Sequence, residues 1–94
     1  MNKKYELNSF NYEIVENYKD GFDYETLKEK ATDYFNDYDY ILGDWSYGKL
    51  RLKGFCDKEN NHYRDINSID NYKTYVKNEC AYDCSWFLIK RIKG

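Results

Sequence analysis

Proline is absent from this chain, so its turns must depend largely on asparagine and on its five glycines. Long apolar runs are also missing, because no stretch approaches the ~18 residues of a membrane-spanning helix. The N-terminus lacks the apolar core of a signal peptide. We therefore expect a cytoplasmic protein with neither a membrane span nor a membrane partner. With 94 residues and no linker, the sequence predicts one domain over residues 1–94 and argues against a two-domain enzyme.

Histidine and cysteine, which supply many metal ligands and nucleophiles, are scarce here. Zinc needs about four ligands, whereas the chain has one histidine, His62, and three cysteines, two of which (Cys80 and Cys84) are separated by three residues instead of the usual two. We favour two buried structural thiols at Cys80 and Cys84, and keep open a redox pair or a metal site completed by Cys56 and His62. A disulfide is not expected in a reducing compartment. No triad can be built around His62, so we expect neither an enzyme nor a cofactor or metal.

Aromatic residues are the main excess, with 12 tyrosines, 5 phenylalanines and 2 tryptophans. The 12 lysines, 3 arginines and 10 asparagines suggest an AT-rich genome, which by itself could raise the tyrosine count. Each buried tyrosine nevertheless removes roughly 150–250 Å² from water. These rings can therefore fill the core in place of the few leucines and valines, and the composition predicts a folded domain rather than a disordered chain.

Charge is distributed unevenly along the chain. Residues 1–48 carry 5 basic and 11 acidic side chains, whereas residues 49–94 carry 10 basic and 6 acidic side chains. Because sequence halves need not be spatial halves, the two signs can interleave in the fold. The distribution nevertheless permits one basic face on a protein whose formal net charge is −2.

The hydrophobic pattern predicts an α+β fold, a small antiparallel sheet with two helices in the approximate order ββαβββαβ. Alternating or apolar runs indicate strands over residues 4–7, 11–16, 38–42, 49–55, 62–66 and 85–92. Helical spacing indicates helices over residues 24–36 and 69–78. Asp23 is the expected N-cap of the first helix, and Phe22 and Leu27 have the spacing of a hydrophobic staple. The last apolar run is expected in the interior of the sheet.

The glycine-bracketed segment 43–48 is expected to be a hairpin loop before the strand 49–55. Gly43 and Gly48 can adopt positive φ, and Asp44 is expected to accept backbone hydrogen bonds within the loop. We therefore assign Gly43, Asp44 and Gly48 a structural role in this loop.

The strongest functional candidate is the segment from Trp45 to Phe55. Lys49, Arg51 and Lys53 project from one face of the strand at intervals of about 7 Å. Trp45, Tyr47 and Phe55 lie at or near its ends. Cations can neutralise phosphates while aromatic rings stack on bases, so this set is suited to RNA. The alternative is a solvated outer face, with Trp45 in the core.

Two segments resemble signatures of the YutD-like family of small bacterial proteins. Residues 38–55 read YDYILGDWSYGKLRLKGF and residues 80–87 read CAYDCSWF, and the preceding YKDGF at residues 18–22 extends the resemblance. The resemblance implies a compact α+β fold and a cytoplasmic bacterial protein, but no activity is assigned to the family and no catalytic residue carries over. It also implies a shared structural or binding role for residues in these signatures: Asp44, Trp45, Tyr47, Arg51, Lys53, Cys80 and Cys84.

We therefore expect a non-enzymatic binding module that contacts RNA or a ribonucleoprotein through the basic and aromatic strand. The alternative is a protein-interaction or regulatory adaptor that uses exposed tyrosine and tryptophan, because these residues are frequent at interface hot spots. A third hypothesis is a thiol redox or metal-binding protein that uses Cys80 and Cys84.

Overall fold

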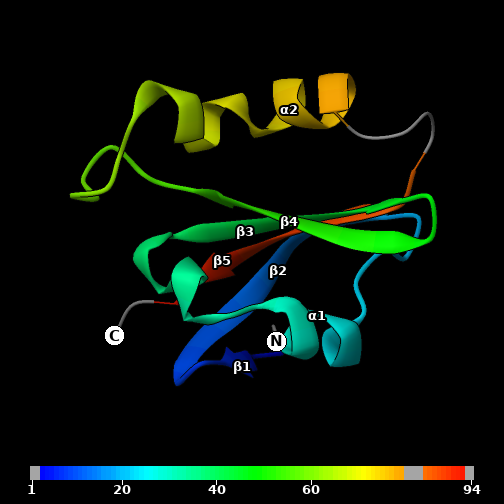
Figure 1. The fold of residues 1–94 in the computed structure, drawn as a ribbon. Helices are drawn as coiled ribbons and strands as arrows, with labels where there is room; N and C mark the ends of the chain where they lie inside the picture. The colour runs from blue at the N-terminus through cyan, green and yellow to red at the C-terminus, as the bar shows by residue number, and fades with distance from the viewer. Residues whose placement is uncertain (1–2, 80–83, 93–94) are drawn as a thin grey trace.

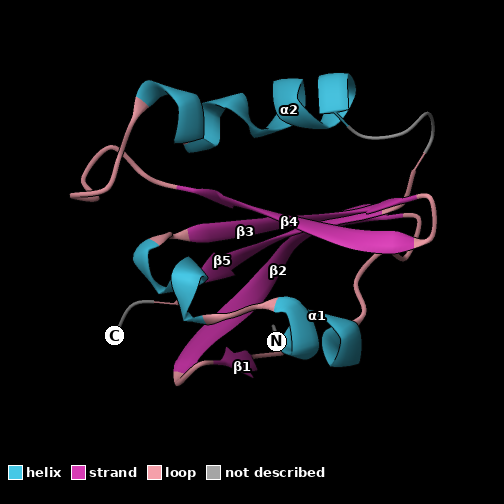
Figure 2. Cartoon of the chain, in the orientation of Figure 1, coloured by secondary structure: helices cyan, strands magenta, loops and turns pink. Residues whose placement is uncertain are grey.

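The computed structural model describes residues 3–79 and 84–92. Within them lies a five-stranded antiparallel sheet with the strand order β1-β2-β5-β3-β4. Two helices lie on opposite faces of this sheet (Figures 1 and 2). The predicted α+β class, with a small antiparallel sheet and two helices, is confirmed. The element bounds are β1 (Tyr5–Leu7), β2 (Phe10–Tyr18), α1 (Tyr24–Lys30), β3 (Tyr40–Ser46), β4 (Lys49–Phe55), α2 (Tyr72–Glu79) and β5 (Trp86–Arg91).

Strand β5 occupies the centre of the sheet, between β2 and β3. Its consecutive residues Phe87, Leu88 and Ile89 are all buried, so both of its faces are covered. A run of apolar residues without alternation is typical of such an interior strand. The expected position of the last strand is therefore confirmed, and it lies where it can hold the two halves of the sheet together.

The sheet has a separate apolar cluster on each face. On the α1 side the buried cluster consists of Leu7, Tyr12, Leu27, Ala31, Ile41, Leu50, Phe87 and Ile89, with Trp45 and Phe22 packed against it. On the α2 side Leu42, Phe55 and Leu88 are covered by α2 and its approach through Ile69, Tyr72, Tyr75 and Val76. Successive side chains of a strand point to opposite faces of the sheet, so alternate residues of each central strand belong to the two different clusters.

Helix α1 begins as predicted but ends earlier. The Asp23 carboxylate accepts a hydrogen bond from the Thr26 backbone N–H at 3.2 Å and caps the helix. The predicted continuation to residue 36 is wrong: the chain becomes extended at Ala31, and a 3₁₀ helix follows at Asp33–Asp37. Tyr34, Phe35 and Tyr38 pack on one another there, so their helical spacing reflects a local aromatic group. Among the described residues, no helix is long and apolar enough to cross a membrane.

The predicted strand over residues 62–66 is also wrong. The segment 57–71 instead forms turns and two short 3₁₀ helices, Asp65–Asn67 and Ile69–Asn71. The buried side chain of Asn67 organises this segment, because its Oδ1 accepts from the Arg64 N–H at 2.7 Å and its Nδ2 donates to the His62 carbonyl at 3.1 Å. A side-chain amide thus satisfies backbone groups that a strand would have paired with a neighbour.

The β3–β4 hairpin has a shorter loop than expected. Strand β3 continues through residues 43–46, and only Tyr47 and Gly48 form the turn. Gly43 therefore has a packing role rather than a turn role, since a Cβ atom at this position would lie 2.3 Å from Cζ of Phe87. In the sequence, a glycine within a run of strand residues suggests that the strand ends there. Here the missing side chain of Gly43 leaves space for the Phe87 ring.

Candidate functional site

The three basic residues of β4 do share one face of the strand, and that face is turned toward α2. Lys53 is paired with Leu42, and Arg51 with Asp44, in the register of β3 and β4. Leu42 belongs to the α2-side cluster, so alternation places Lys49, Arg51 and Lys53 on the α2 side as well.

The aromatic half of the predicted RNA surface is not assembled. Trp45 lies on the opposite face, packed against the α1-side cluster, and its Nε1 donates a hydrogen bond to the Gly21 carbonyl at 2.7 Å. Phe55 is buried and its ring contacts Tyr75 edge-on, with centroids 5.8 Å apart. The single surface expected for these aromatic and basic residues is therefore wrong, because a strand sends neighbouring side chains to opposite faces.

Arg51 holds the fold together rather than presenting a free cation. Its Nε donates to Asp44 Oδ1 at 2.8 Å, and its guanidinium also donates to the Glu79 carbonyl at the end of α2, at 2.6 Å. The Asp44 side chain is only 2% exposed and also accepts from the Ser46 hydroxyl at 3.3 Å. Asp44 is thus a buried strand residue and not the expected loop acceptor, and Arg51 ties the sheet to α2.

The tip of the β3–β4 hairpin exposes one aromatic ring. Tyr47 is 96% exposed and has a φ of 53°, and Gly48 follows with a φ of 78°. Two consecutive residues with positive φ form the two-residue turn that matches the twist of a hairpin, and asparagine followed by glycine is the preferred pair. Gly48 is the residue that this turn prefers at its second position. Tyr47 is not a residue that prefers positive φ, and its exposed ring does not pack in the core.

Among the described residues, the cysteine and histidine side chains are not gathered into a metal site. Cys84 is half-buried and disulfide-bonded, so the expectation of a free buried thiol is wrong at this position. We expected no disulfide because the cytoplasm is a reducing compartment, but this argument says nothing about the distance between two cysteines in the fold. Cys80 lies outside the described residues. His62 is exposed, with Nε2 3.5 Å from Asp37, and within the described part of the chain no three His, Cys, Asp or Glu side chains could together hold a metal ion.

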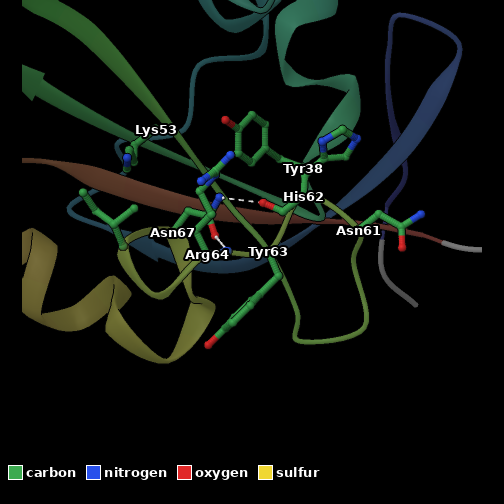
Figure 3. A pocket seen from close by; sticks show the side chains of 8 residues that line it. Tyr38, Lys53, Asn61, His62, Tyr63, Arg64 and Asn67 are labelled. Atoms are coloured by element: carbon green, nitrogen blue, oxygen red, sulfur yellow. Dashed lines mark hydrogen bonds between the residues drawn. The ribbon is translucent and has the colours of Figure 1, made fainter.

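A cavity of about 420 Å³ lies beside the end of β4 (Figure 3). We call it the cationic cavity, because its lining includes Lys53 and Arg64 but no aspartate or glutamate; the lining residues are Tyr38, Lys53, Asn61, His62, Tyr63, Arg64, Ile66 and Asn67. Neither Lys53 nor Arg64 has an ion-pair partner among the described residues. A carboxylate-free lining with two cations favours an anionic group as its occupant.

Tyr38 supplies a neutral aromatic wall to the cationic cavity. Its hydroxyl hydrogen-bonds with that of Tyr34 at 3.1 Å, and this bond, together with burial, raises the pKa of Tyr38 to about 12. Its ring packs against Gly54, where a Cβ atom would lie 2.4 Å from the ring. The ring therefore adds apolar surface to the cavity without adding a negative charge at neutral pH.

A second cavity, of about 470 Å³, lies on the α2 side of β4. We call it the apolar cavity; it is lined by Lys53, Phe55, Ile66, Asn71, Thr74, Tyr75, Asn78 and Glu79. Lys53 and Ile66 line both cavities, and Ile66 is 76% exposed. The cationic cavity and the apolar cavity are therefore adjacent, and both lie beside Lys53 of β4.

Sequence reasoning missed most residues of this site because it assigned residues 62–66 to a strand. Asparagines at positions 60, 61 and 67 are turn-forming residues on both sides of a very short run, and they could have indicated a loop. No sequence signal distinguishes the exposed Ile66 from a core isoleucine. Its exposure follows only from the 3₁₀ turns around it.

Comparison with known proteins places this fold and site in a family. A family model described as "Putative antitoxin YutD-like" matches residues 6–90. The chain belongs to this family. The match spans all of β4 and the loop that forms the cationic cavity, so the site lies inside the YutD-like region and not in an added segment.

A similar protein sequence and a similar solved structure, both named YutD, come from Bacillus subtilis. A protein of strain 168 named "Putative antitoxin YutD" is 44% identical over 82 residues, which cover 87% of this chain and 90% of that protein. The solution NMR structure of protein yutD from B. subtilis has a TM-score of 0.79 and 40% identity, covering 97% of this chain and 83% of that chain. The YutD-like resemblance drawn from the signature residues is therefore confirmed, and with it a bacterial protein.

Proposed function

We propose that this YutD-like protein is a binding protein without a catalytic reaction of its own, and that it acts by holding a protein partner. The name of the 44% identical relative contains the word antitoxin, a term for a protein that neutralises a toxin. We extend a role of this type to this chain, and the outer edge of β4 with the hairpin tip is the surface that would hold the partner.

Tyr47 is the observation that carries this proposal. A tyrosine in the left-handed region costs about 1–2 kcal/mol compared with the usual backbone conformations, and its ring gains no packing in return. Strain of this kind at an exposed position is typical of a functional site. Tyrosine is also enriched among interface hot spots, because a rigid ring buries a large area with little loss of side-chain entropy.

Exposed Ile66 supports the same surface from the other end of β4. The seven residues of β4 span roughly 20 Å at about 3.3 Å per residue, with Tyr47 just before the strand and Ile66 beside its end. A partner in contact with both side chains would therefore lie along the whole strand. RNA contact has less support, since Trp45 and Phe55 are in the two cores and Arg51 is held by Asp44 and α2.

The test is affinity capture from a lysate of a bacterium that carries the gene, using tagged wild-type protein and variants. Tyr47→Ser and Ile66→Ser should each lose the same captured protein, which is then purified and titrated. Loss of a hot-spot ring should weaken binding roughly tenfold or more. Val15→Ser is the matched control, since Val15 is an exposed apolar residue of β2 that lies on neither cavity. Capture that disappears after ribonuclease treatment, or an equal loss with Val15→Ser, would contradict the proposal.

A further inference from the structure

The cationic cavity and the apolar cavity share a wall. Lys53 and Ile66 line both of them, and their volumes are about 420 and 470 Å³. Each volume lies within the range of roughly 300–1,000 Å³ that is typical of small-molecule sites. Two adjacent cavities with different linings suit a ligand that has one charged part and one apolar part.

The cationic cavity is lined by two cations that come from different elements. Lys53 belongs to β4 and Arg64 to the loop that follows it (Figure 3). Neither has an ion-pair partner in the parts of the chain that the structure describes, and the lining contains no aspartate or glutamate. His62 is not a third free cation, because its Nε2 is 3.5 Å from the Asp37 carboxylate. An ammonium and a guanidinium in one cavity favour a carboxylate or phosphate group there.

Lys53 places its charge next to the apolar cavity. Its Nζ lies 6.0 Å from the centroid of the Phe55 ring, within the range of a cation–π contact. Phe55 and Tyr75 both line the apolar cavity, and their rings meet edge-on. A ligand whose anionic group contacts Lys53 therefore has aromatic surface beside it for an apolar group.

The two ends of the apolar cavity differ in charge. Asn71, just before α2, donates a side-chain hydrogen bond at 3.0 Å to the Asp65 carbonyl, which lies in the loop that forms the cationic cavity. Glu79 ends α2, about 12 Å further along at 1.5 Å per residue, and its carboxylate repels an anion at that end. The anionic group of a ligand is therefore expected at the end that adjoins the loop and Lys53.

We propose that the two cavities form one binding site for a small organic anion, a carboxylate or phosphate that carries an apolar group about the size of one aromatic ring. The anionic group binds between Lys53 and Arg64. The apolar group lies in the apolar cavity against Ile66, Phe55 and Tyr75. This site goes beyond the proposed function, because it takes a small molecule and needs no protein partner.

Titration of the folded wild-type chain with matched probes, followed by amide NMR, tests the site. Phenylbutyrate and phenylbutyl phosphate carry both parts of the proposed ligand, phenylbutanol lacks the charge, and butyrate lacks the ring. The two charged aromatic probes should cause saturable shifts at Lys53, Arg64, Ile66 and Tyr75. Phenylbutanol and butyrate should each bind at least about fivefold more weakly than phenylbutyrate, because each loses its contacts in one of the two cavities. The tighter of the two charged aromatic probes identifies the preferred anionic group.

Substitutions separate the two parts of the site. Arg64→Gln and Lys53→Gln should each weaken phenylbutyrate binding roughly fivefold and leave phenylbutanol binding within about twofold, because only a charge is lost. Lys58→Gln, at an exposed turn lysine that lines neither cavity, is the matched control and should change both by less than about twofold. Ile66→Ser should weaken both probes to a similar extent, since it removes apolar contact. Arg64 and Ile66 are exposed, so their variants keep the test valid if Lys53→Gln is poorly folded.

Selectivity and location decide the outcome. Shifts scattered over the surface, shifts that do not saturate, or equal affinities for phenylbutyrate and phenylbutanol would each overturn the inference. An effect of Lys58→Gln as large as that of Arg64→Gln would do the same, because it would show attraction to the overall charge of the chain and not to this site.

Discussion

At the scale of single residues, two buried aspartates account for much of the polar structure. Asp44 is paired with Arg51, and Asp39 lies 3.7 Å from an Arg91 guanidinium nitrogen while accepting from the Asp57 N–H at 2.8 Å. Buried carboxylates of this kind are stable only when cations and hydrogen-bond donors surround them. The alternating pattern of β4 placed Arg51 on a polar face, but it could not show that α2 covers part of that face.

Removal of the Arg51 side chain should destabilise the protein. Arg51→Ala leaves the Asp44 carboxylate buried without its cation and frees the C-terminal end of α2. Because Arg51 is itself 45% exposed, we expect a loss of about 2 kcal/mol in the free energy of unfolding, less than for a fully buried pair. Urea denaturation followed by tryptophan fluorescence measures this loss.

Two further variants separate the ion pair from general effects on β4. Lys49→Ala, an exposed neighbour on the same face, should change the free energy of unfolding by no more than about 0.5 kcal/mol. Asp44→Asn in the Arg51→Ala background should recover part of the loss, because it removes the buried uncompensated charge. Equal stabilities for Arg51→Ala and Lys49→Ala would show that the pair contributes nothing.

At the scale of elements, alternation was the most reliable signal and glycine the most misleading. The predicted strand 49–55 has the bounds of β4, because Leu50 and Leu52 face one core while charged residues face the other side. Gly43 led to a predicted loop where the strand continues, since the pattern of β3 does not reveal that the Phe87 ring needs the space of a missing side chain. The sheet could thus be predicted, whereas the cavities could not, because they depend on how loop 57–71 folds back on β4.

The hairpin turn should become more stable when Tyr47 is replaced by asparagine. Asparagine tolerates the left-handed conformation, and asparagine followed by glycine is the preferred pair for this turn. We expect Tyr47→Asn to raise the free energy of unfolding by about 0.5 to 1 kcal/mol while weakening partner binding. Urea denaturation and the binding titration described above measure the two effects.

Tyr47→Ala is the control for this turn. Alanine also removes the ring but does not favour positive φ, so it should weaken binding without the gain in stability. If Tyr47→Asn were less stable than the wild type, the exposed ring would contribute to folding. The argument that its position reflects function would then fail.

At the scale of the whole molecule, the aromatic excess fills two cores and their rims, and several tyrosine hydroxyls are held in the neutral form. Burial, followed by the charge of Asp57, raises the pKa of Tyr40 to about 12. Burial and a hydrogen bond to Glu16 raise that of Tyr72 to about 12. Tyr40 and Tyr72 pack against the α2-side cluster, whereas Tyr38 packs on Gly54, so each tyrosine contributes separately to the pH dependence of stability.

These tyrosines should make the protein lose stability in alkaline solution. Each pKa is about 12 in the folded chain and about 10 in the unfolded chain, so the unfolded state releases protons first. Their contribution is complete below about pH 10 and is lost as the pH rises through about 12, because unfolding then becomes coupled to ionisation. Urea denaturation across this range, with tyrosinate absorbance recorded in parallel, should show a falling free energy of unfolding. Tyr72→Phe, which cannot ionise at this position, should show a shallower fall, and an identical fall in both proteins would contradict the role of Tyr72.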